Sequence, residues 1–511
     1  MSTFGRRALI QGAGAALAGR AVGLDGSRSA SAAADDVFRW GVASFDPGPD
    51  SVLLWTRIAP GPTDSTTTLS WVVASDADLG DEVASGTVEV GPDTGWCARA
   101  DATGLGAAGV WWYAFTSPDG TRSPVGRTRT FAAASSERLR IAAVSCARFA
   151  DGGFAVYRAL AEREIDLVVQ LGDYVYEDGG EAARAHVPPH ELLTLDDYRT
   201  RYEQHRSDPD LQALHARHPM VAIWDDHEIA GNAWRGGAPG HDEATDGPWA
   251  ARVEAALRAH DEWLPGRTEW TEDRRLRAWR SASLGPLAEL IVLDTRLWGR
   301  DRQAQSAAEL VEDGARSMLG PDQQAFVSER LAAPDRAPWA LVANQVMLHP
   351  LRVPVPSEAI GRRIEEEGFL VVDGEALNPD QWDGYPAARD ELVGAVGGQG
   401  GVVVLTGDVH SSWAWEGPAT DSGAPACVEL VAPSVTSGSF ATRLPLPAAV
   451  AERAISALDD DLSFIEIESH GYLLVDLTPD RVQGEWWYVE PADAGSQRFG
   501  AARSAPRQVP M

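Results

Sequence analysis

Polar residues that can bind metals follow five short apolar runs of this chain, each at a point where a buried strand would end. The carboxyl ends of parallel strands meet at one edge of a sheet, so we expect these side chains to lie together. In chain order the five groups are Ser145-Cys146, Gly172-Asp173-Tyr174-Val175-Tyr176-Glu177, Asp225-Asp226-His227-Glu228, Asn344-Gln345 and Gly407-Asp408-Val409-His410.

The residue types in these groups indicate metal ligands of mixed hardness. Carboxylate and amide oxygens suit hard divalent cations. Thiolate, phenolate and imidazole together suit a transition-metal ion, and iron(III) accepts all three. Carboxylates gathered without a cation would repel one another. Taken singly, Cys146 could be a buried apolar residue, Tyr176 a packing aromatic, His227 and His410 core histidines, and Asp225-Asp226 a loop pair or helix cap. A metal site is the stronger interpretation, because these alternatives would all have to hold at the ends of five strands.

The elements that would carry these residues fall into two parts. Between residues 37 and 131, alternating runs at 51–57, 69–74, 86–90 and 110–116 predict a β-sandwich of fibronectin or immunoglobulin type. Residues 132–138 are expected to be a linker. After it, runs at 139–144 and 166–171 with a helical pattern at 154–164 between them form a β-α-β unit, which predicts a layered α/β domain.

Further apolar runs continue this second part. Strands are expected at 219–224, 289–294, 339–343, 401–405 and 471–476, and helices at 248–264 and 321–331. The segment 351–389 is long and polar with scattered Pro and Gly, and we expect a loop-rich insertion near the site. The predicted boundaries are 36–131 for the first domain and 138–490 for the second, with a tail at 491–511.

Composition limits the partners of the protein. The chain has 511 residues and a formal net charge of −31, which disfavours binding to nucleic acid or to anionic membranes. Three cysteines leave at least one thiol without an intrachain partner. No run of eighteen apolar residues occurs, so no transmembrane helix is expected in the mature protein.

The N-terminus carries the pair Arg6-Arg7, followed by an Ala- and Gly-rich stretch and by small residues around 29–34. This pattern resembles a twin-arginine (Tat) export signal covering residues 1–35. It predicts a protein that is exported by the Tat machinery and is secreted, periplasmic or associated with the cell wall.

The strand-end groups together resemble the calcineurin-like metallophosphoesterases, and in their variant form the alkaline phosphatase D (PhoD-like) family. Cys146 stands where an Asp-x-His motif is usual, and Gly407-Asp408-Val409-His410 replaces the usual Gly-His-x-His. Other segments resemble that family in the same order: Gly41-Val-Ala-Ser44, Leu54-Trp-Thr-Arg57, Leu293-Asp-Thr-Arg296, Met318-Leu-Gly320, Gln381-Trp-Asp-Gly-Tyr385 and Pro433-Ser-Val-Thr436. Phe45 departs from the family, which has glycine there.

The resemblance implies an N-terminal β-sandwich followed by a four-layer αββα metallophosphoesterase domain, with iron(III) beside calcium. It assigns Cys146, Asp173, Tyr176 and His410 to iron. Asp173 would also bridge to calcium, together with Asp226, Asn344 and Asp408. The choices of Asp226 over Asp225 and of Asn344 over Gln345 stay open.

The implied function is an exported, metal-dependent alkaline phosphatase or phosphodiesterase. It would hydrolyse phosphate esters by attack of a metal-bound water or hydroxide. His227 is the candidate for protonating the leaving alkoxide. Arg148 is a candidate for holding a phosphate oxygen, although a plain surface arginine is slightly favoured.

Other interpretations stay open from the sequence. One is a phospholipase D-like phosphodiesterase of the same family, and another is a non-catalytic binding module whose site has decayed. A zinc metallopeptidase is disfavoured because no His-Glu-x-x-His occurs. Substrates are expected to be small phosphate esters, with phospholipid or teichoic-acid-type diesters left open by the loops 179–191 and 351–389.

Overall fold

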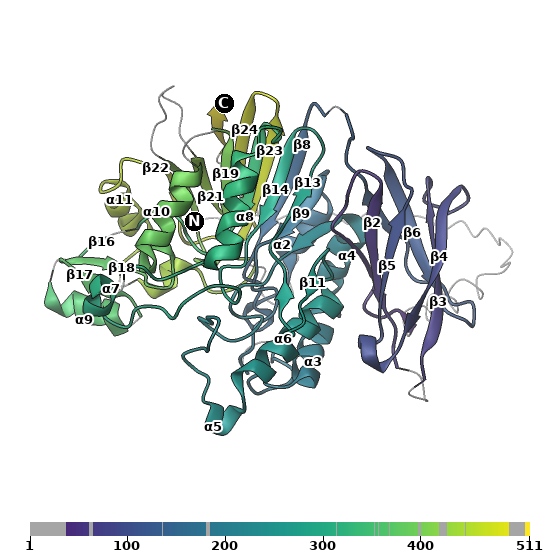
Figure 1. The fold of residues 1–511 in the computed structure, drawn as a ribbon, viewed down its shortest axis with the longest axis horizontal. Coiled ribbons are helices and arrows are strands. Elements are labelled where there is room, and N and C mark those ends of the chain that lie inside the picture. The colour runs from purple at the N-terminus through teal and green to yellow at the C-terminus, as the bar shows by residue number, and fades with distance from the viewer. Residues whose placement is uncertain are drawn as a thin grey trace, which may run out of the picture.

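A computed structural model describes residues 37–60, 65–134, 136–179, 184–312, 314–351, 353–355, 357–366, 368–396, 400–417, 427–444, 446–489 and 506–510. The predicted export signal at 1–35 lies outside these residues, and so does the predicted tail at 491–511 apart from 506–510. The described chain combines two large sheets with helices, and the predicted α/β class is confirmed (Figure 1).

The largest sheet has nine strands in the order β25-β24-β23-β8-β9-β10-β1-β2-β5. Its central strands, β8 (Leu139–Val144), β9 (Leu167–Gln170) and β10 (Met220–Ala222), run parallel and are almost entirely buried. Continuous apolar runs are typical of such strands because helices or sheets cover both faces. The flanking strands are β1 (Val42–Phe45), β2 (Ser51–Arg57), β5 (Cys97–Thr103), β23 (Gly471–Thr478), β24 (Arg481–Tyr488) and β25 (Pro506–Pro510).

The second large sheet has seven strands in the order β13-β14-β15-β19-β21-β20-β22. Four of them, β14 (Ala288–Val292), β15 (Trp339–Ala343), β19 (Val402–Thr406) and β21 (Cys427–Val431), are parallel neighbours. The antiparallel strands at the two sides are β13 (Arg280–Ser283), β20 (Ser412–Glu416) and β22 (Leu462–Glu466).

The alternation of side chains along β15 and β19 shows how the sheets pack. Leu341 and Leu405 join a hydrophobic cluster that also contains Val169 of β9, so the two large sheets share one core. Their neighbours Val342 and Val404 face the other way, into a cluster with side chains of α8 (Gly320–Ala332) and α10 (Pro386–Val396). The two helices lie against this outer face of the seven-stranded sheet (Figure 1).

Helices also pack beside the nine-stranded sheet. Helix α2 (Ala155–Ala161) packs against α4 (Pro209–Arg217), and α3 (Leu195–Arg206) packs against α6 (Trp249–Trp263). Helix α3 begins with a capping box in which Thr194 and Asp197 satisfy each other's backbone amides. The remaining helices are α5 (Glu243–Asp246), α7 (Ala307–Glu312), α9 (Glu358–Glu366) and α11 (Ala448–Ser456).

The N-terminal part contributes to two sheets. A four-stranded sheet has the order β4-β3-β6-β7, formed by β3 (Thr67–Ala74), β4 (Glu82–Val90), β6 (Val110–Thr116) and β7 (Gly126–Arg129). Its buried side chains share a hydrophobic cluster with those of β2 and β5. Strand β1 pairs in parallel with β10, so the sheet formed by β1, β2 and β5 continues into the second part of the chain, which the sequence did not predict.

One expectation is wrong. The segment 351–389, expected to be loop-rich, contains α9 and a three-stranded sheet of β16 (Val353–Pro354), β18 (Glu375–Leu377) and β17 (Leu370–Val372). The three strands span only two or three residues each and α9 only nine, and such short stretches give little periodic signal. A further pair of short strands, β11 (Glu269–Trp270) and β12 (Leu276–Arg277), forms a two-stranded sheet.

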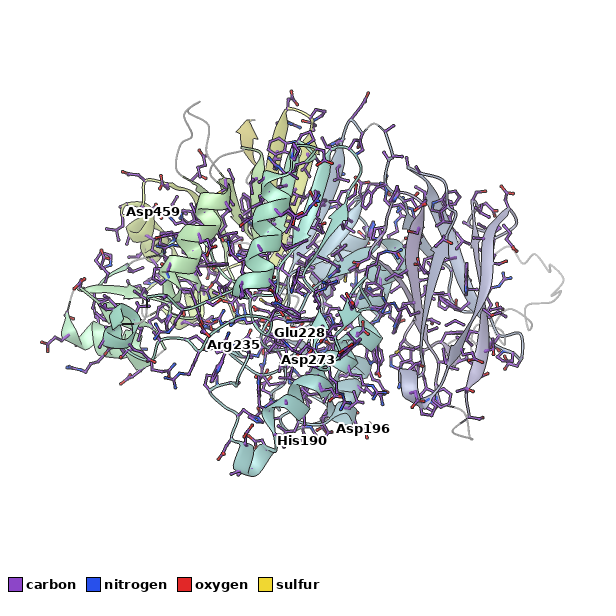
Figure 2. All side chains as sticks on the ribbon, in the orientation of Figure 1. His190, Asp196, Glu228, Arg235, Asp273 and Asp459 are labelled. Carbon is purple, nitrogen blue, oxygen red and sulfur yellow. The ribbon has the colours of Figure 1, made fainter. Side chains whose placement is uncertain are left out.

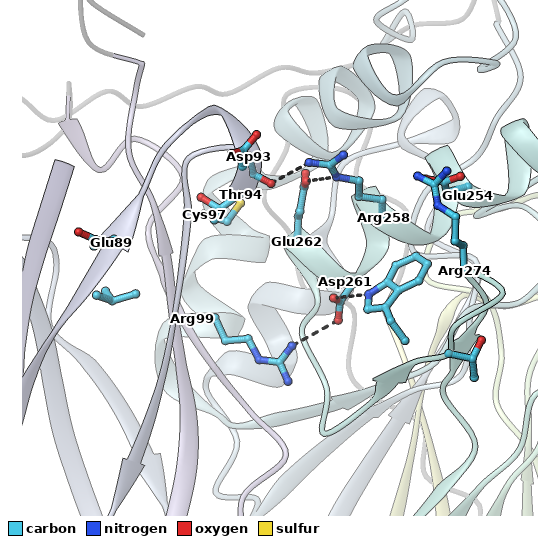
Figure 3. A pocket seen from close by; sticks show the side chains of 13 residues that line it. Glu89, Asp93, Thr94, Cys97, Arg99, Glu254, Arg258, Asp261, Glu262 and Arg274 are labelled. Carbon is cyan, nitrogen blue, oxygen red and sulfur yellow. Dashed lines mark hydrogen bonds and ion pairs between the residues drawn. The ribbon is translucent and has the colours of Figure 1, made fainter. Parts of the chain in front are cut away.

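A groove of about 540 Å³ lies where β5 meets α6 (Figure 3). An ion pair between Arg99 and Asp261 crosses it at 3.4 Å, and the guanidinium of Arg258 donates to the carbonyl of Asp93 at 2.8 Å. Both contacts join the N-terminal part of the chain to the helix.

Candidate active site

The polar residues after the strands lie on an unusual backbone. Cys146, Asp173, Asp408 and His410 have φ values of 60°, 56°, 61° and 52°. Non-glycine residues rarely adopt this left-handed conformation, and such strain collects at functional sites. Each of these four residues was predicted as a metal ligand from its place behind an apolar run.

The structure brings the predicted iron ligands together. One ligand atom each from Cys146, Asp173 and His410 lies within 4.8 Å of the others, and all three residues are buried. The Tyr176 hydroxyl donates to Asp173 Oδ2 at 2.9 Å and lies 3.4 Å from His410 Nε2. Thiol, carboxylate, phenol and imidazole therefore converge on one point. Cys146, Asp173 and Tyr176 follow β8 and β9 of the nine-stranded sheet, whereas His410 follows β19 of the seven-stranded sheet.

Two further groups of carboxylates adjoin this point. Asp226 offers an oxygen within 4.8 Å of both Asp173 and His227, and it forms a second such group with Asp225 and Asp408. Within the described part of the chain, the buried Oδ2 atom of Asp225 has no hydrogen-bond partner. A buried carboxylate oxygen without a partner is costly, which makes a cation the natural complement of these groups.

The pKa shifts of Cys146, Asp173, Tyr176 and His410 also indicate that a cation would complement the site. Burial raises the pKa of the Cys146 thiol well above its usual 9.0, and burial raises that of the Tyr176 phenol well above 10.0, with Asp173 adding to both shifts. Burial likewise raises the pKa of Asp173 and lowers that of His410 to about 3. A cation reverses this balance for the acids, because it stabilises thiolate, phenolate and carboxylate. The residues present therefore fit a metal.

His227 forms a pair with a carboxylate beside the site. Its Nδ1 atom lies 2.6 Å from Glu177 Oε2, and its ring stacks on Tyr176 with 4.2 Å between ring centres. Burial opposes the charged ring, but Glu177, Asp226 and Asp173 outweigh it and raise the pKa of His227 well above 6.5. The raised pKa favours the protonated ring, and its second nitrogen stays free of Glu177, as a proton donor needs.

Two residues have a supporting role that the sequence did not predict. The Glu228 carboxylate accepts the backbone amides of Asp173 at 2.9 Å and Asp225 at 2.8 Å, so it ties the end of β9 to the end of β10. The Ser437 hydroxyl lies 2.7 Å from the Tyr176 hydroxyl and 2.9 Å from the carbonyl of Cys146. Glu228 ends one of the strand-end groups, and Ser437 directly follows the segment Pro433-Ser-Val-Thr436. This place in the chain was the only indication of either role in the sequence.

Asn344 and Gln345, one of the two pairs between which the ligand choice stayed open, differ in their surroundings. Asn344 donates to Thr406 Oγ1 at 3.2 Å and accepts from the Trp382 indole at 3.1 Å, which leaves one lone pair of its amide oxygen. Gln345 accepts from Thr295 and donates to the carbonyl of Leu293 at 2.9 Å. Gln345 is therefore part of the framework, and Asn344 is the better candidate of the two.

Arg148 is held by two carboxylates. Its guanidinium forms ion pairs with Asp151 and Asp178, and about a quarter of its side chain is exposed. A phosphate oxygen would have to displace one of these partners. The arrangement favours the interpretation of Arg148 as a paired surface residue.

A separate group of possible ligands consists of His349, Asp459 and Asp461. Figure 2 shows Asp459 at one side of the molecule and Glu228 near its middle, so this group is apart from the strand-end cluster. The Asp459 carboxylate already accepts from His349 at 3.0 Å and from the Trp415 indole at 2.9 Å. These bonds explain the group without a metal.

Similarity to known proteins identifies the class: this chain is a phosphoric ester hydrolase. It matches the families described as "PhoD-like phosphatase" over residues 141–486 and "PhoD-like phosphatase, N-terminal domain" over residues 25–132. It is 33% identical over 443 residues to alkaline phosphatase D of Bacillus subtilis (strain 168), covering 81% of this chain and 72% of that protein. A solved structure described as "Structure of PhoD" aligns with a TM-score of 0.79 and 29% identity, covering 92% of this chain and 89% of that one. The chain belongs to the PhoD-like phosphatase family.

Two further observations concern the helices of the described residues and the cysteines. Among the residues described, none of the helices combines the length and the apolar character needed to cross a membrane. Cys97, Cys146 and Cys427 are all free thiols and all buried, in agreement with the odd cysteine count.

Proposed function

We propose that this chain is an exported, metal-dependent alkaline phosphatase or phosphodiesterase. The observation that carries the proposal is the convergence of Cys146, Asp173, Tyr176 and His410 on one buried point, with Asp226 and Asp408 beside it. Its membership of the PhoD-like phosphatase family supports the ester bond as the target. A decayed binding module is disfavoured because such a module would not keep this set of ionisable side chains together.

The ligands divide by chemistry. Cys146, Asp173, Tyr176 and His410 offer sulfur, oxygen and nitrogen, the mixture that iron(III) accepts. Asp173, Asp226, Asn344 and Asp408 offer oxygen alone, which suits calcium. Such cations would supply positive charge to the phosphate oxygens and would acidify water.

The protein's own residues perform the remaining steps. Glu177 accepts a hydrogen bond from Nδ1 of His227, which fixes the ring and leaves Nε2 to give its proton to the leaving alkoxide. Tyr176 stacks on the same ring and so restricts its rotation. Arg148 holds a phosphate oxygen only if the substrate replaces Asp178 as its partner.

The fold supports finer assignments that belong to the same proposal. The two large sheets share one core and carry helices on their outer sides, which we interpret as a four-layer αββα domain over residues 138–490. We interpret the four-stranded sheet with β1, β2 and β5 as an N-terminal sandwich over residues 36–131. Export by the Tat route rests on the sequence of residues 1–35 alone.

Turnover of p-nitrophenyl phosphate and of its bis ester tests the proposed function. The purified protein should hydrolyse at least one of them, should lose activity on chelation, and should regain it when iron and calcium are restored. Activity that survives complete removal of metal, as measured by elemental analysis, would show that the proposed metal dependence is wrong.

A further inference from the structure

One buried arginine occupies the space between the carboxylates of the second group. The side chain of Arg296 is fully buried, and its Nη2 atom lies 3.0 Å from Asp408 Oδ1 and 3.4 Å from Asp226 Oδ1. Its Nη1 atom lies 2.8 Å from Asp380 Oδ2, and its Nε atom forms an ion pair with Asp225. Four carboxylates from three separate segments therefore meet on a single guanidinium.

The backbone at Arg296 is fixed independently of these ion pairs. Asp294 Oδ1 accepts the amide of Arg296 at 2.9 Å and that of Leu297 at 2.8 Å. Gln345 Oε1 accepts the amide and the hydroxyl of Thr295 at 3.0 and 2.6 Å. The turn after β14 thus aims the guanidinium at a set place, which gives the segment Leu293-Asp-Thr-Arg296 a function that the sequence did not reveal.

The other oxygen of Asp408 is held from a different side. The Gln381 amide donates to Asp408 Oδ2 at 2.6 Å, and Gln381 in turn accepts the backbone amide of Met347. Asp226 Oδ2 accepts the backbone amide of Asn232. Asp408 is therefore hydrogen-bonded at both oxygens and Asp226 at Oδ2, while Asp226 Oδ1 faces Arg296 Nη2 at 3.4 Å, so both carboxylates contact Arg296.

We propose that Arg296 is a positioning residue for the second metal position, where it sets the spacing and direction of the Asp226 and Asp408 carboxylates. Asp225 and Asp380 anchor the guanidinium from its other edges. The inference rests on the proposed function, because it assigns Asp226 and Asp408 to a divalent cation. A planar guanidinium suits the task since its donors point in fixed directions, whereas a lysine ammonium is a single point of charge.

Arg300 provides a matched control. Its side chain is also fully buried and pairs with Asp380, with Nη2 lying 2.6 Å from Asp380 Oδ1. Its other bonds run to the carbonyls of Thr295 at 3.1 Å and Asp380 at 2.8 Å and to Met318. Loss of Arg300 removes a comparable buried charge without touching either predicted ligand.

The test compares wild type with R296K, R296M and R300M by calorimetric titration with calcium chloride after removal of calcium. The two Arg296 variants should bind calcium at least about 10-fold more weakly, the effect typical of losing a residue that orients a ligand. R300M should bind calcium within about threefold of wild type. Iron content, by elemental analysis, should stay unchanged in all variants, since Arg296 contacts none of Cys146, Tyr176 or His410 among its ion pairs.

The opposite result has a clear physical meaning. If Arg296 merely offsets negative charge, then its removal leaves a more negative site, and R296M should bind calcium as tightly as wild type or more tightly; that outcome overturns the inference. R296K keeps the charge, so it decides the matter if R296M does not fold: calcium affinity equal to that of wild type in R296K would likewise overturn the inference. Wild type that is active without binding calcium would instead refute the second metal of the proposed function.

Discussion

Left-handed backbone at Cys146, Asp173, Asp408 and His410 concentrates strain in the cluster of proposed ligands. Each such non-glycine residue costs about 1–2 kcal/mol. The surrounding hydrogen bonds resist relaxation: the carbonyl of Gly438 accepts a hydrogen bond from His410 Nδ1 at 2.8 Å, and the Glu228 carboxylate accepts the amide of Asp173. The side chains are therefore placed before any cation binds, which reduces the cost of binding.

His227 should matter most where the leaving group needs a proton. In H227N, the rate constant kcat for an alkyl phosphate should fall by about 100-fold or more, because general acid catalysis contributes about 10²–10⁴-fold. The loss for p-nitrophenyl phosphate should be much smaller, since nitrophenolate leaves without protonation. Steady-state rates with the two esters measure the difference.

Glu177 supplies the control for that experiment. E177Q keeps His227 but removes the carboxylate 2.6 Å from its Nδ1 atom, so the rate with the alkyl ester should fall by an intermediate factor. An equal loss for both leaving groups in H227N would show that His227 does not donate the proton.

Sequence alone indicated the residues that directly follow apolar runs, and it could not indicate those that support them. Asp173 and Asp408 each stand behind a strand that is apolar enough to recognise. Glu228 acts on Asp173 from 55 positions away, and Ser437 acts on Tyr176 from 261 positions away. Such pairs depend on how two sheets stack, and no local pattern of residues encodes that arrangement.

At the scale of elements, the turn after β9 requires a glycine. Gly172 has φ of 106°, and a Cβ atom built there would lie 2.3 Å from Cβ of Asp225 and 2.5 Å from its backbone nitrogen. The contact is with the end of β10, which a neighbouring parallel strand fixes in place. Glycine thus allows β9 and β10 to bring Asp173 and Asp226 together.

We expect G172A to lower the free energy of unfolding by more than about 3 kcal/mol, because it adds a steric overlap to backbone strain. Gly104 is the matched control: its φ is 76°, and nothing lies within 4 Å of a Cβ built there. G104A should therefore cost only about 1 kcal/mol. Denaturant unfolding that gives equal losses for the two variants would contradict the close contact.

The success of element prediction followed the strength of the apolar signal. Strands β15 and β19 are continuous apolar runs and were predicted almost to the residue. Strand β5 has the sequence Cys-Ala-Arg-Ala-Asp-Ala-Thr, and it was missed because its buried side chains are small. Helix α3 was missed because it is rich in charge, although Tyr198, Arg201 and Tyr202 are buried in it.

For the whole molecule, buried neutral histidines should make stability fall in acid. Burial lowers the pKa of His260 to about 3 from its usual 6.5. Below pH 6.5 the unfolded chain binds a proton that the folded chain does not, so stability is lost as the pH falls. Between pH 7.5 and pH 5 this one residue should remove about 2 kcal/mol.

His260→Gln tests this contribution. The free energy of unfolding of H260Q should depend less on pH than that of wild type, by about 2 kcal/mol over the same interval. Comparing the two proteins cancels the contributions of every other titrating group. Identical pH profiles would show that His260 is not held neutral in the folded protein.

Strands from two sheets meet in this molecule, and Asp173 stands at their meeting point. It lies in one group with Cys146 and His410 and in another with Asp226 and His227. A residue shared by both groups fits the bridging role that we propose for Asp173 between two metals.

The most direct test of this account replaces Asp173 with Asn and measures metal content and phosphate ester hydrolysis on the same folded preparation. We predict that D173N loses bound metal and that hydrolysis falls by at least about 10³-fold, with the circular dichroism spectrum unchanged. A D173N protein that keeps wild-type turnover of p-nitrophenyl phosphate or its bis ester would contradict the central claim.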